Sequence, residues 1–160
     1  PSRVARAAPL IARWVQEHVE RPLLIGPDAE SEQWVSEVAT AAGAPFTVLQ
    51  KTRRGDREVE VSLPDVPAWH DRQPVLVDDI ISSARTMIEA VGSIRRVGLA
   101  APVCIGVHAL FAPGAYDALL ACGAAGVVTC DTIAHPSNCI GVAEPMARAL
   151  EQLLMAPGSA

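Results

Sequence analysis

Short, mostly apolar runs alternate along this chain with segments whose apolar residues recur every three or four positions. The runs cover residues 23–25, 75–77, 103–107 and 127–130. Runs of this length predict strands that are buried on both faces of a parallel sheet. Their alternation with helical segments predicts an α/β domain with a central, mostly parallel sheet of about five strands flanked by helices. A length of 160 residues matches a single domain over residues 1–160.

The expected helices have apolar residues on one face and Pro or Gly at their ends. Pro22 ends the first of them, and Gly43 takes the C-terminal cap position of the second. A further strand is expected over residues 46–49. The expected helices cover residues 10–19, 34–42, 87–97, 113–122 and 146–154.

The composition argues against two kinds of partner. Six residues are aromatic (three Trp, one Tyr and two Phe), and the net charge is −5 at pH 7. Proteins that bind nucleic acid stack bases on aromatic side chains and present basic surfaces, so no nucleic acid is expected as a partner. The apolar stretches end well before the roughly 18 residues that suggest a membrane span, so no membrane partner is expected either.

The cysteines indicate a reducing compartment. Cys104, Cys122, Cys130 and Cys139 show no C-x-x-C spacing, and three of them have the apolar neighbours typical of buried thiols. The apolar residues near the start of the sequence are spaced as a helix face, so no signal peptide is expected. The expected location is therefore cytoplasmic. The sequence does not begin with Met, which suggests processing or a longer protein.

A charged segment lies between two expected strands. Residues 51–58 are polar throughout, carry four basic and two acidic residues, and are expected to form a loop. Residues 58–63 alternate polar and apolar side chains, the pattern of a half-exposed strand, which places the loop in a hairpin-like flap. Without further motifs, Lys51 and Arg53 would be interpreted as solvated surface charges. Arg54 and Arg57 are interpreted in that way.

The segment most informative about chemistry follows the run at residues 75–77. Asp78 and Asp79 place two adjacent carboxylates at the end of a strand, and Ser82, Ser83 and Thr86 then open a helix. Adjacent carboxylates repel each other and need a partner; hydroxyl groups suit them. A helix N-terminus presents unpaired N–H groups and suits a phosphate monoester. The pattern predicts a phosphorylated sugar as ligand; the alternative is an ordinary turn in which Ser or Asp caps the helix.

Ligands of open parallel sheets bind beyond the carboxyl ends of the strands. Candidate site segments are therefore the loops at residues 26–31, 51–58, 78–86, 108–113 and 131–138. The sequence contains no Walker A, G-x-G-x-x-G, H-E-x-x-H, EF-hand or G-x-S-x-G motif, which removes the common alternatives for nucleotide, metal and nucleophile sites.

Residues 75–86, V-L-V-D-D-I-I-S-S-A-R-T, resemble the phosphoribosyl-pyrophosphate (PRPP) loop that type I phosphoribosyltransferases share with ribose-phosphate pyrophosphokinases, or PRPP synthetases. Four further motifs resemble, in the same order, the C-terminal half of the pyrophosphokinases: Gly26-Pro27-Asp28, Lys51-x-Arg53, His108-x-x-Phe111 and Asp131-Thr132-Ile133. The resemblance covers about residues 10–155. It implies a phosphoribosyltransferase-like fold and the C-terminal domain of a longer, two-domain enzyme.

The resemblance implies an Mg²⁺-dependent transferase that moves the diphosphoryl group of ATP onto the anomeric hydroxyl of ribose 5-phosphate, giving PRPP and AMP. Asp78 and Asp79 would bind the ribose hydroxyls. Lys51 and Arg53 would close over the transferring phosphates, whose charge cations stabilise. The implied partners are ATP, ribose 5-phosphate and further copies of the chain in a homo-oligomer. The 5-phosphate would be held by Ser82, Ser83, Ala84, Arg85 and Thr86.

Other residues of these motifs have two interpretations each. By analogy with the family, Asp28 would lie near the metal and the pyrophosphate; alternatively, it caps the helix that carries Trp34. His108 would contact phosphate or ribose, or have only a structural role. Asp131 and Thr132 would either touch the ligand or stabilise the neighbouring turn.

The sequence also departs from the family. Many members have an acidic residue and a Gly-rich stretch in the phosphate loop, where Arg85 here replaces a small residue. Arg85 would add a phosphate donor, or strain the loop if a positive φ were required there. The upstream domain that supplies much of the ATP site in the family is not in this sequence. Two alternatives therefore stay open: a stand-alone type I phosphoribosyltransferase that consumes PRPP, and a non-catalytic regulatory subunit similar to PRPP synthetase.

Overall fold

A six-stranded sheet forms the centre of the computed structural model, which describes residues 2–54 and 58–155. Every neighbouring pair in this sheet is parallel, which confirms the predicted α/β class. The strand order is β2-β1-β5-β6-β7-β8. The strands are β1 (Pro22–Gly26), β2 (Phe46–Val48), β5 (Gln73–Ile81), β6 (Val103–Ala109), β7 (Gly126–Cys130) and β8 (Asn138–Ile140).

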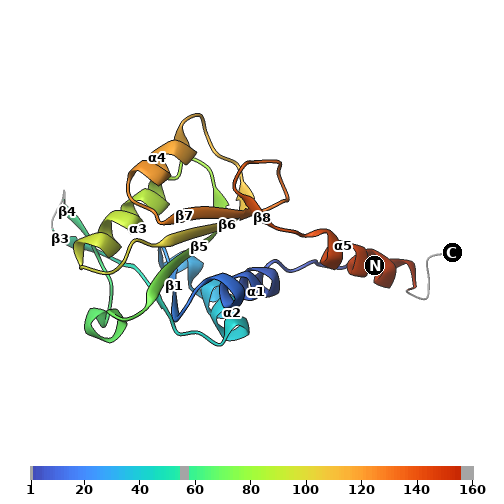
Figure 1. The fold of residues 1–160 in the computed structure, drawn as a ribbon, viewed down its shortest axis with the longest axis horizontal. Coiled ribbons are helices and arrows are strands. Elements are labelled where there is room, and N and C mark those ends of the chain that lie inside the picture. Colours follow the sequence, from blue (N-terminus) through green and yellow to red (C-terminus); the bar gives the residue numbers. More distant parts are fainter. Residues whose placement is uncertain (1, 55–57, 156–160) are drawn as a thin grey trace.

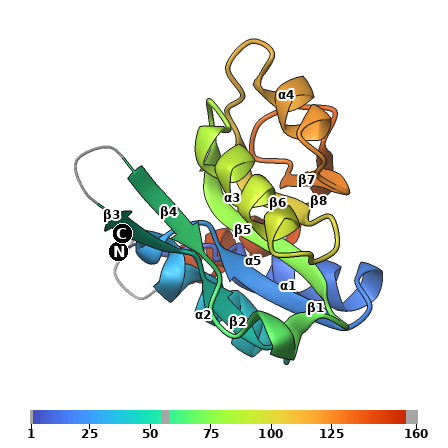
Figure 2. The ribbon, with the colours of Figure 1, turned by 90° about the vertical axis from the view of Figure 1, so that its left-hand side faces the viewer.

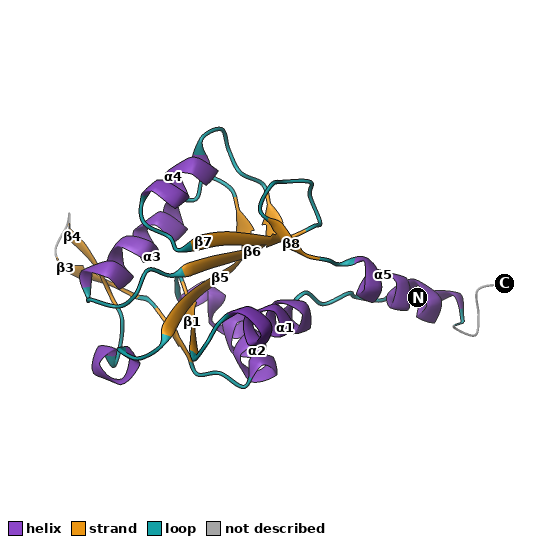
Figure 3. Cartoon of the chain, viewed as in Figure 1, coloured by secondary structure: helices purple, strands orange, loops and turns teal. Residues whose placement is uncertain are grey.

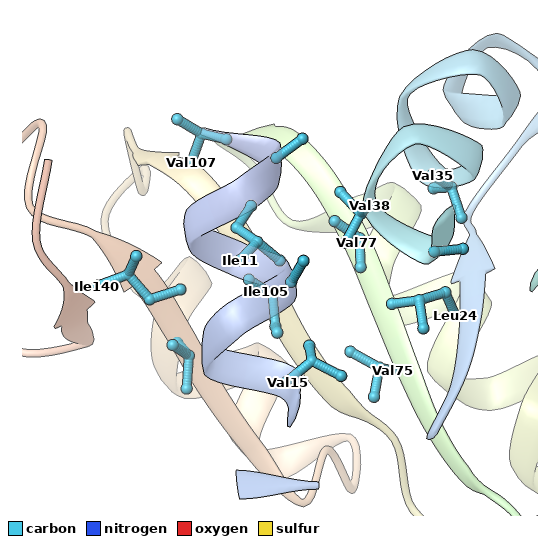
Figure 4. Packing of buried hydrophobic residues seen from close by; sticks show 14 of the residues in the cluster. Ile11, Val15, Leu24, Val35, Val38, Val75, Val77, Ile105, Val107 and Ile140 are labelled. Carbon is cyan, nitrogen blue, oxygen red and sulfur yellow. The ribbon is translucent and has the colours of Figure 1, made fainter. Parts of the chain in front are cut away.

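Helices cover both faces of the sheet (Figures 1 and 3). One face is covered by α1 (Ala8–His18) and α2 (Glu32–Ala42), and the other by α3 (Arg85–Arg96) and α4 (Ala115–Ala121). Successive residues of a strand point to opposite faces, so Leu24 packs under α1 and α2 while Leu23 and Ile25 pack on the α3 side. Figure 4 shows the first of these cores, where Ile11 and Val15 of α1 lie over the strands.

The flap is a hairpin. β3 (Gln50–Arg54) and β4 (Glu58–Ser62) pair in antiparallel fashion and project from the main sheet (Figure 2). The prediction of a hairpin is confirmed, but the loop was predicted too long, because residues 51–54 form a strand. Backbone hydrogen bonds make this ladder, and they do not require apolar side chains. Residues 55–57, with Arg57, lie outside the described part of the chain.

β5 is longer than the apolar run that predicted it. Its pairing with β6 continues through Asp78↔Gly106 to Ile81↔Ala109, so the two aspartates lie within the strand instead of ending it. β8 was not predicted, because Asn138–Ile140 is a three-residue strand without an apolar run.

The last helix stands apart from the body of the protein. α5 (Ala143–Leu154) extends away from the sheet beside the N-terminal segment (Figure 1). It has no buried residue, and Met146 and Leu150 are each 56% exposed. Among the described residues, no helix is long and apolar enough to cross a membrane.

Candidate functional site

The candidate site lies where β1, β5 and β6 end at the carboxyl edge of the sheet. The first of two adjoining hollows is a cavity of about 360 Å³ that is predominantly acidic. It brings together side chains that are far apart in the sequence. Its lining residues are Asp28, Glu30, Ser31, Trp34, Asp78 and Asp79.

Asp78 is the half-buried member of the acidic pair, and Asp79 is exposed. The Asp79 backbone N–H donates to Asp78 Oδ1 at 3.0 Å. The pKa of Asp78 is raised to about 6, mainly by burial; the hydrogen bond from the Asp79 backbone lowers it, and the negative charges of Asp79 and Asp28 contribute to the rise. A hydroxyl donor or a cation in this cavity would therefore relieve an unfavourable concentration of negative charge.

Asp28 caps the short 3₁₀ turn Ala29–Ser31 that leads into α2. Its Oδ1 accepts the backbone N–H groups of Glu30 and Ser31, each at 3.1 Å. The capping interpretation is thus correct in substance, except that the capped element is the 3₁₀ turn and not α2 itself. The same residue also lines the acidic cavity, so capping does not remove it from the site.

The second hollow is formed by the predicted phosphate loop. It measures about 140 Å³ and adjoins the acidic cavity through Asp78, which lines both. The N-terminus of α3 has no side-chain cap, so its first N–H groups are available to a ligand. The lining residues are Asp78, Ile80, Ile81, Ser82, Ser83, Ala84, Arg85, Thr86 and Met87.

The backbone of this loop corrects one expectation. The residue with positive φ is Ala84 (φ 58°), and Arg85 is already the first residue of α3. The loop therefore does not strain Arg85. Because α3 begins at Arg85, Ser82 and Ser83 precede the helix instead of opening it. Both serines and Arg85 are exposed, and Thr86 is half-buried.

Lys51 and Arg53 lie on β3, paired with Val61 and Val59. Their side chains lie outside the part of the chain whose side chains the structure describes.

His108, near the end of β6, and Thr132, just after β7, are joined at the same edge of the sheet. His108 Nδ1 lies 2.9 Å from Thr132 Oγ1, and Thr132 Oγ1 donates to the Val107 carbonyl at 3.0 Å. Asp131 Oδ1 accepts the backbone N–H of Val142 at 2.8 Å, which supports its turn-stabilising interpretation. His108 lines neither of the two hollows, although β6 pairs it with Ile80 of the phosphate hollow.

Trp34 is a site residue that the sequence analysis missed. Its apolar spacing predicted only a core position, and it does pack against the core, but it also lines the acidic cavity. Its indole Nε1 is buried without a hydrogen-bond partner among the described residues. No sequence signal distinguishes this tryptophan from an ordinary core residue.

The acidic cavity can be compared with what a divalent cation requires. Among the described residues, no three His, Cys, Asp or Glu side chains form a group that could hold a metal on its own. Mg²⁺, however, is usually bound by one or two carboxylates together with waters and substrate phosphates. The oxygen donors of Asp28, Asp78 and Asp79 fit a cation that arrives with a phosphate ligand.

Curated relatives of this chain are ribose-phosphate pyrophosphokinases. A ribose-phosphate pyrophosphokinase from Methanopyrus kandleri is 32% identical over 155 residues, covering 96% of this chain and 53% of its own length. A ribose-phosphate pyrophosphokinase from Sulfurisphaera tokodaii is 29% identical over 145 residues, which are 89% of this chain and 49% of the relative. The chain thus spans about half the length of these curated relatives.

Solved structures share the fold. Phosphoribosylpyrophosphate synthetase from Mycobacterium smegmatis superposes with a TM-score of 0.78 at 23% identity, covering 93% of this chain and 51% of that one. Orotate phosphoribosyltransferase from Aeropyrum pernix superposes with a TM-score of 0.58 at 13% identity, covering 89% of this chain and 73% of that one. The family of the phosphoribosyl transferase domain matches residues 2–150. The chain therefore belongs to the phosphoribosyl transferase domain family.

Proposed function

We propose that this chain is the ribose-phosphate-binding part of a ribose-phosphate pyrophosphokinase. The reaction transfers the diphosphoryl group of ATP to the anomeric hydroxyl of ribose 5-phosphate, giving PRPP and AMP. One observation carries the proposal: the acidic cavity and the phosphate-loop hollow meet at Asp78, so a single ligand can occupy both. A ligand with hydroxyls at one end and a phosphate at the other has the matching chemistry.

Each end of ribose 5-phosphate has groups suited to it. The 5-phosphate accepts hydrogen bonds from the side chains of Ser82, Ser83, Arg85 and Thr86. It also accepts them from the backbone N–H of Ala84 and from the uncapped N-terminus of α3. Asp78 and Asp79 accept hydrogen bonds from the ribose hydroxyls. This interaction is favourable because it pairs carboxylates that otherwise repel each other.

Lys51 and Arg53 act on the transferring group from the flap. A phosphoryl group in transfer spreads negative charge over its equatorial oxygens, and cations positioned there stabilise the transition state. Lys51 is the only lysine of the sequence. The position of β3 in a projecting hairpin supports a role for these side chains as a cover.

Asp28 would hold Mg²⁺ together with substrate phosphate oxygens, with Asp78 and Asp79 nearby. The metal, when bound, would neutralise charge on the diphosphoryl group. Asp28 itself is fixed by the two backbone N–H groups that it accepts, so its carboxylate is oriented before any ligand arrives.

The relatives favour a pyrophosphokinase over a phosphoribosyltransferase that consumes PRPP. The curated relatives compared above carry the pyrophosphokinase name, and the M. smegmatis synthetase gives a higher TM-score than the orotate enzyme. We infer that these 160 residues supply the sugar-phosphate half of the site. The rest of the ATP site would come from the other domain of the longer enzyme. That enzyme would be a cytoplasmic homo-oligomer.

The experiment that tests this function combines binding with product analysis. Calorimetry of the chain with ribose 5-phosphate is expected to show weak binding, whereas ribose without the phosphate is not expected to bind. Asp79→Asn should lower the affinity by about 10-fold, the loss of one charge-assisted hydrogen bond. The exposed Asp117→Asn on α4 is the matched control. A chain that binds neither ribose 5-phosphate nor PRPP would contradict the proposal.

Product analysis separates the two enzyme classes. With Mg²⁺, ATP and ribose 5-phosphate, a preparation that includes the remaining half of a full-length relative should release AMP in proportion to PRPP. Pyrophosphate release from PRPP that depends on an added nucleobase would instead assign the chain to the phosphoribosyltransferases that consume PRPP.

A further inference from the structure

Two hydrogen bonds of the Thr132 hydroxyl, one with His108 and one with the Val107 carbonyl, determine where the imidazole carries its proton. The Thr132 hydroxyl donates to the Val107 carbonyl, with Oγ1 and O separated by 3.0 Å. The same Oγ1 lies 2.9 Å from His108 Nδ1. A hydroxyl has one hydrogen, and here the Val107 carbonyl receives it, so Nδ1 must be the donor in the second bond. Neutral His108 is therefore protonated on Nδ1 and carries its lone pair on Nε2.

The same bond orients the ring relative to the phosphate loop. β6, which carries His108, lies between β5 and β7, and Thr132 follows β7. The two ring nitrogens point in diverging directions, so a ring whose Nδ1 is bonded on the β7 side directs Nε2 away from β7. On the other side of β6, Ile80 of β5 pairs with His108. The loop after β6 also contacts the phosphate loop, where the Ala112 N–H donates to the Ser82 carbonyl at 3.1 Å.

We propose that His108 binds the phosphate of a phosphomonoester substrate through Nε2, as an imidazolium whose orientation is set by Thr132. This inference rests on the proposed function for the location of the phosphomonoester. Neutral His108 would direct a lone pair at phosphate oxygens, which are themselves acceptors. Binding therefore adds a proton from solvent to Nε2, and the proton stays on the imidazole to form a charge-assisted hydrogen bond.

The surrounding charges bear on this protonation. The neighbouring elements carry these titratable or charged groups: Asp78 and Asp79 on β5; Arg85, Glu89, Arg95 and Arg96 on α3; Tyr116 and Asp117 on α4; and Cys130, Asp131 and His135 on or after β7.

His135 provides an internal reference, because its tautomer is the opposite one. The backbone N–H of Ser137 donates to His135 Nδ1 at 3.2 Å. A backbone N–H can only donate, so Nδ1 of His135 is an acceptor and its proton lies on Nε2. The ring is also held between Phe111 and Tyr116, with centroids 4.7 and 4.9 Å away.

The first test measures the tautomers directly. Long-range ¹H–¹⁵N correlation spectra of the ¹⁵N-labelled chain are recorded above the pH range in which imidazole titrates, with the four histidines assigned by His→Gln substitutions. His108 is expected to be the Nδ1–H tautomer and His135 the Nε2–H tautomer. Thr132→Val keeps the shape of the side chain but removes the acceptor, and should change the tautomer of His108 alone. An Nε2–H pattern for His108 in the unsubstituted chain would overturn the inference.

The second test adds ribose 5-phosphate, inorganic phosphate or ribose near neutral pH. Both phosphate ligands should convert His108 to the imidazolium pattern, and ribose should not. His108→Ala should weaken ribose 5-phosphate binding by about 10-fold or more. His108→Gln places an amide N–H near the position of Nε2 and should recover most of that affinity, whereas His108→Asn should not. A residue with only a structural role would show no ligand-dependent protonation.

The outcomes separate this inference from the proposed function. If ribose 5-phosphate binds while His108 keeps its neutral spectrum, the role of His108 is wrong and the proposed function is unaffected. If neither ribose 5-phosphate nor inorganic phosphate binds, the phosphomonoester site is absent and both proposals fail.

Discussion

Asp28 follows β1 and Asp78 lies within β5, yet both carboxylates line one cavity at the carboxyl edge of the sheet. Burial is the main reason that the pKa of Asp78 rises to about 6, and the charges of Asp79 and Asp28 add to it. The cavity is thus unfavourable for further negative charge and favourable for hydroxyl donors or a cation. In the proposed site, these carboxylates would favour sugar hydroxyls over a second phosphate.

Asp78→Asn is expected to raise stability at neutral pH. Because the pKa of Asp78 rises from 3.8 to about 6 on folding, its stabilising contribution is present below the lower value and is lost as the pH rises through the upper one. Asparagine has no such titration. We therefore expect the free energy of unfolding of the variant not to fall over this pH range. At neutral pH it should exceed that of the unsubstituted chain by on the order of 1 kcal/mol. Calorimetric melting temperatures across this range test the expectation, with Asp117→Asn as control. If the melting temperatures of Asp78→Asn and Asp117→Asn fell equally as the pH rises, the expectation would be contradicted.

Gly26→Ala is expected to disturb the Asp28 turn. An added Cβ would lie 2.8 Å from Val48 Cγ1 and closer still to Ser31 Oγ, the hydroxyl that donates to the Asp28 carbonyl. The expected loss of stability is about 1–3 kcal/mol, with weaker ligand binding.

Gly92→Ala is the matched control for this substitution. Gly92 lies within α3 and a Cβ there would meet nothing within 4 Å, so alanine should stabilise the protein by about 0.5–1 kcal/mol. Urea denaturation measures both variants. Similar effects at the two positions would show that the close approach at Gly26 does not matter.

Ala84→Gly is expected to relax the phosphate loop. Ala84 has a φ of 58°, a conformation that costs about 1 kcal/mol in a residue with a Cβ. Glycine relieves this cost, but it also removes the buried methyl group, which offsets part of the gain. The substitution should therefore be neutral or stabilising by up to about 1 kcal/mol. Ala84→Val should destabilise by more than that, because a β-branched residue is unsuited to positive φ. If valine were tolerated as well as glycine, the left-handed conformation would be wrong.

Lys51→Ala is expected to lower turnover far more than substrate affinity, by about 10³-fold in kcat, if Lys51 acts on the transferring phosphates. The measurement is AMP release by a full-length pyrophosphokinase that contains these residues, compared with ribose 5-phosphate affinity. Arg57→Ala, a nearby basic residue in the sequence, is the control and should change kcat little. Unaltered turnover in Lys51→Ala would remove the flap from the mechanism.

The fold was largely predictable because buried parallel strands leave a simple signal. Uninterrupted apolar residues at 23–25 and 75–77 identify β1 and β5, and Gly43, with a φ of 66°, marks the end of α2 as predicted. β3 was missed because Lys51–Arg54 has no periodic apolar residue. Its strand structure depends on its partner β4, which a local pattern cannot reveal.

The candidate site was predictable in its parts but not in its geometry. The acidic pair and the hydroxyl-rich loop follow from local chemistry. That Asp28 meets Asp78 depends on β1 and β5 being neighbours, which is a property of the sheet order. The place of Trp34 beside the carboxylates and the tautomer of His108 depend on tertiary contacts, so no spacing rule could have supplied them.

The central claim is that one ligand spans the acidic cavity and the phosphate loop. The most direct test is a ¹H–¹⁵N titration of the chain with ribose 5-phosphate, following the backbone amides of Asp79, Ser83, Arg85 and Thr86. These amides should shift together with one dissociation constant, and ribose alone should shift none of the last three. Saturating ribose 5-phosphate that leaves all four amides unchanged would contradict the claim.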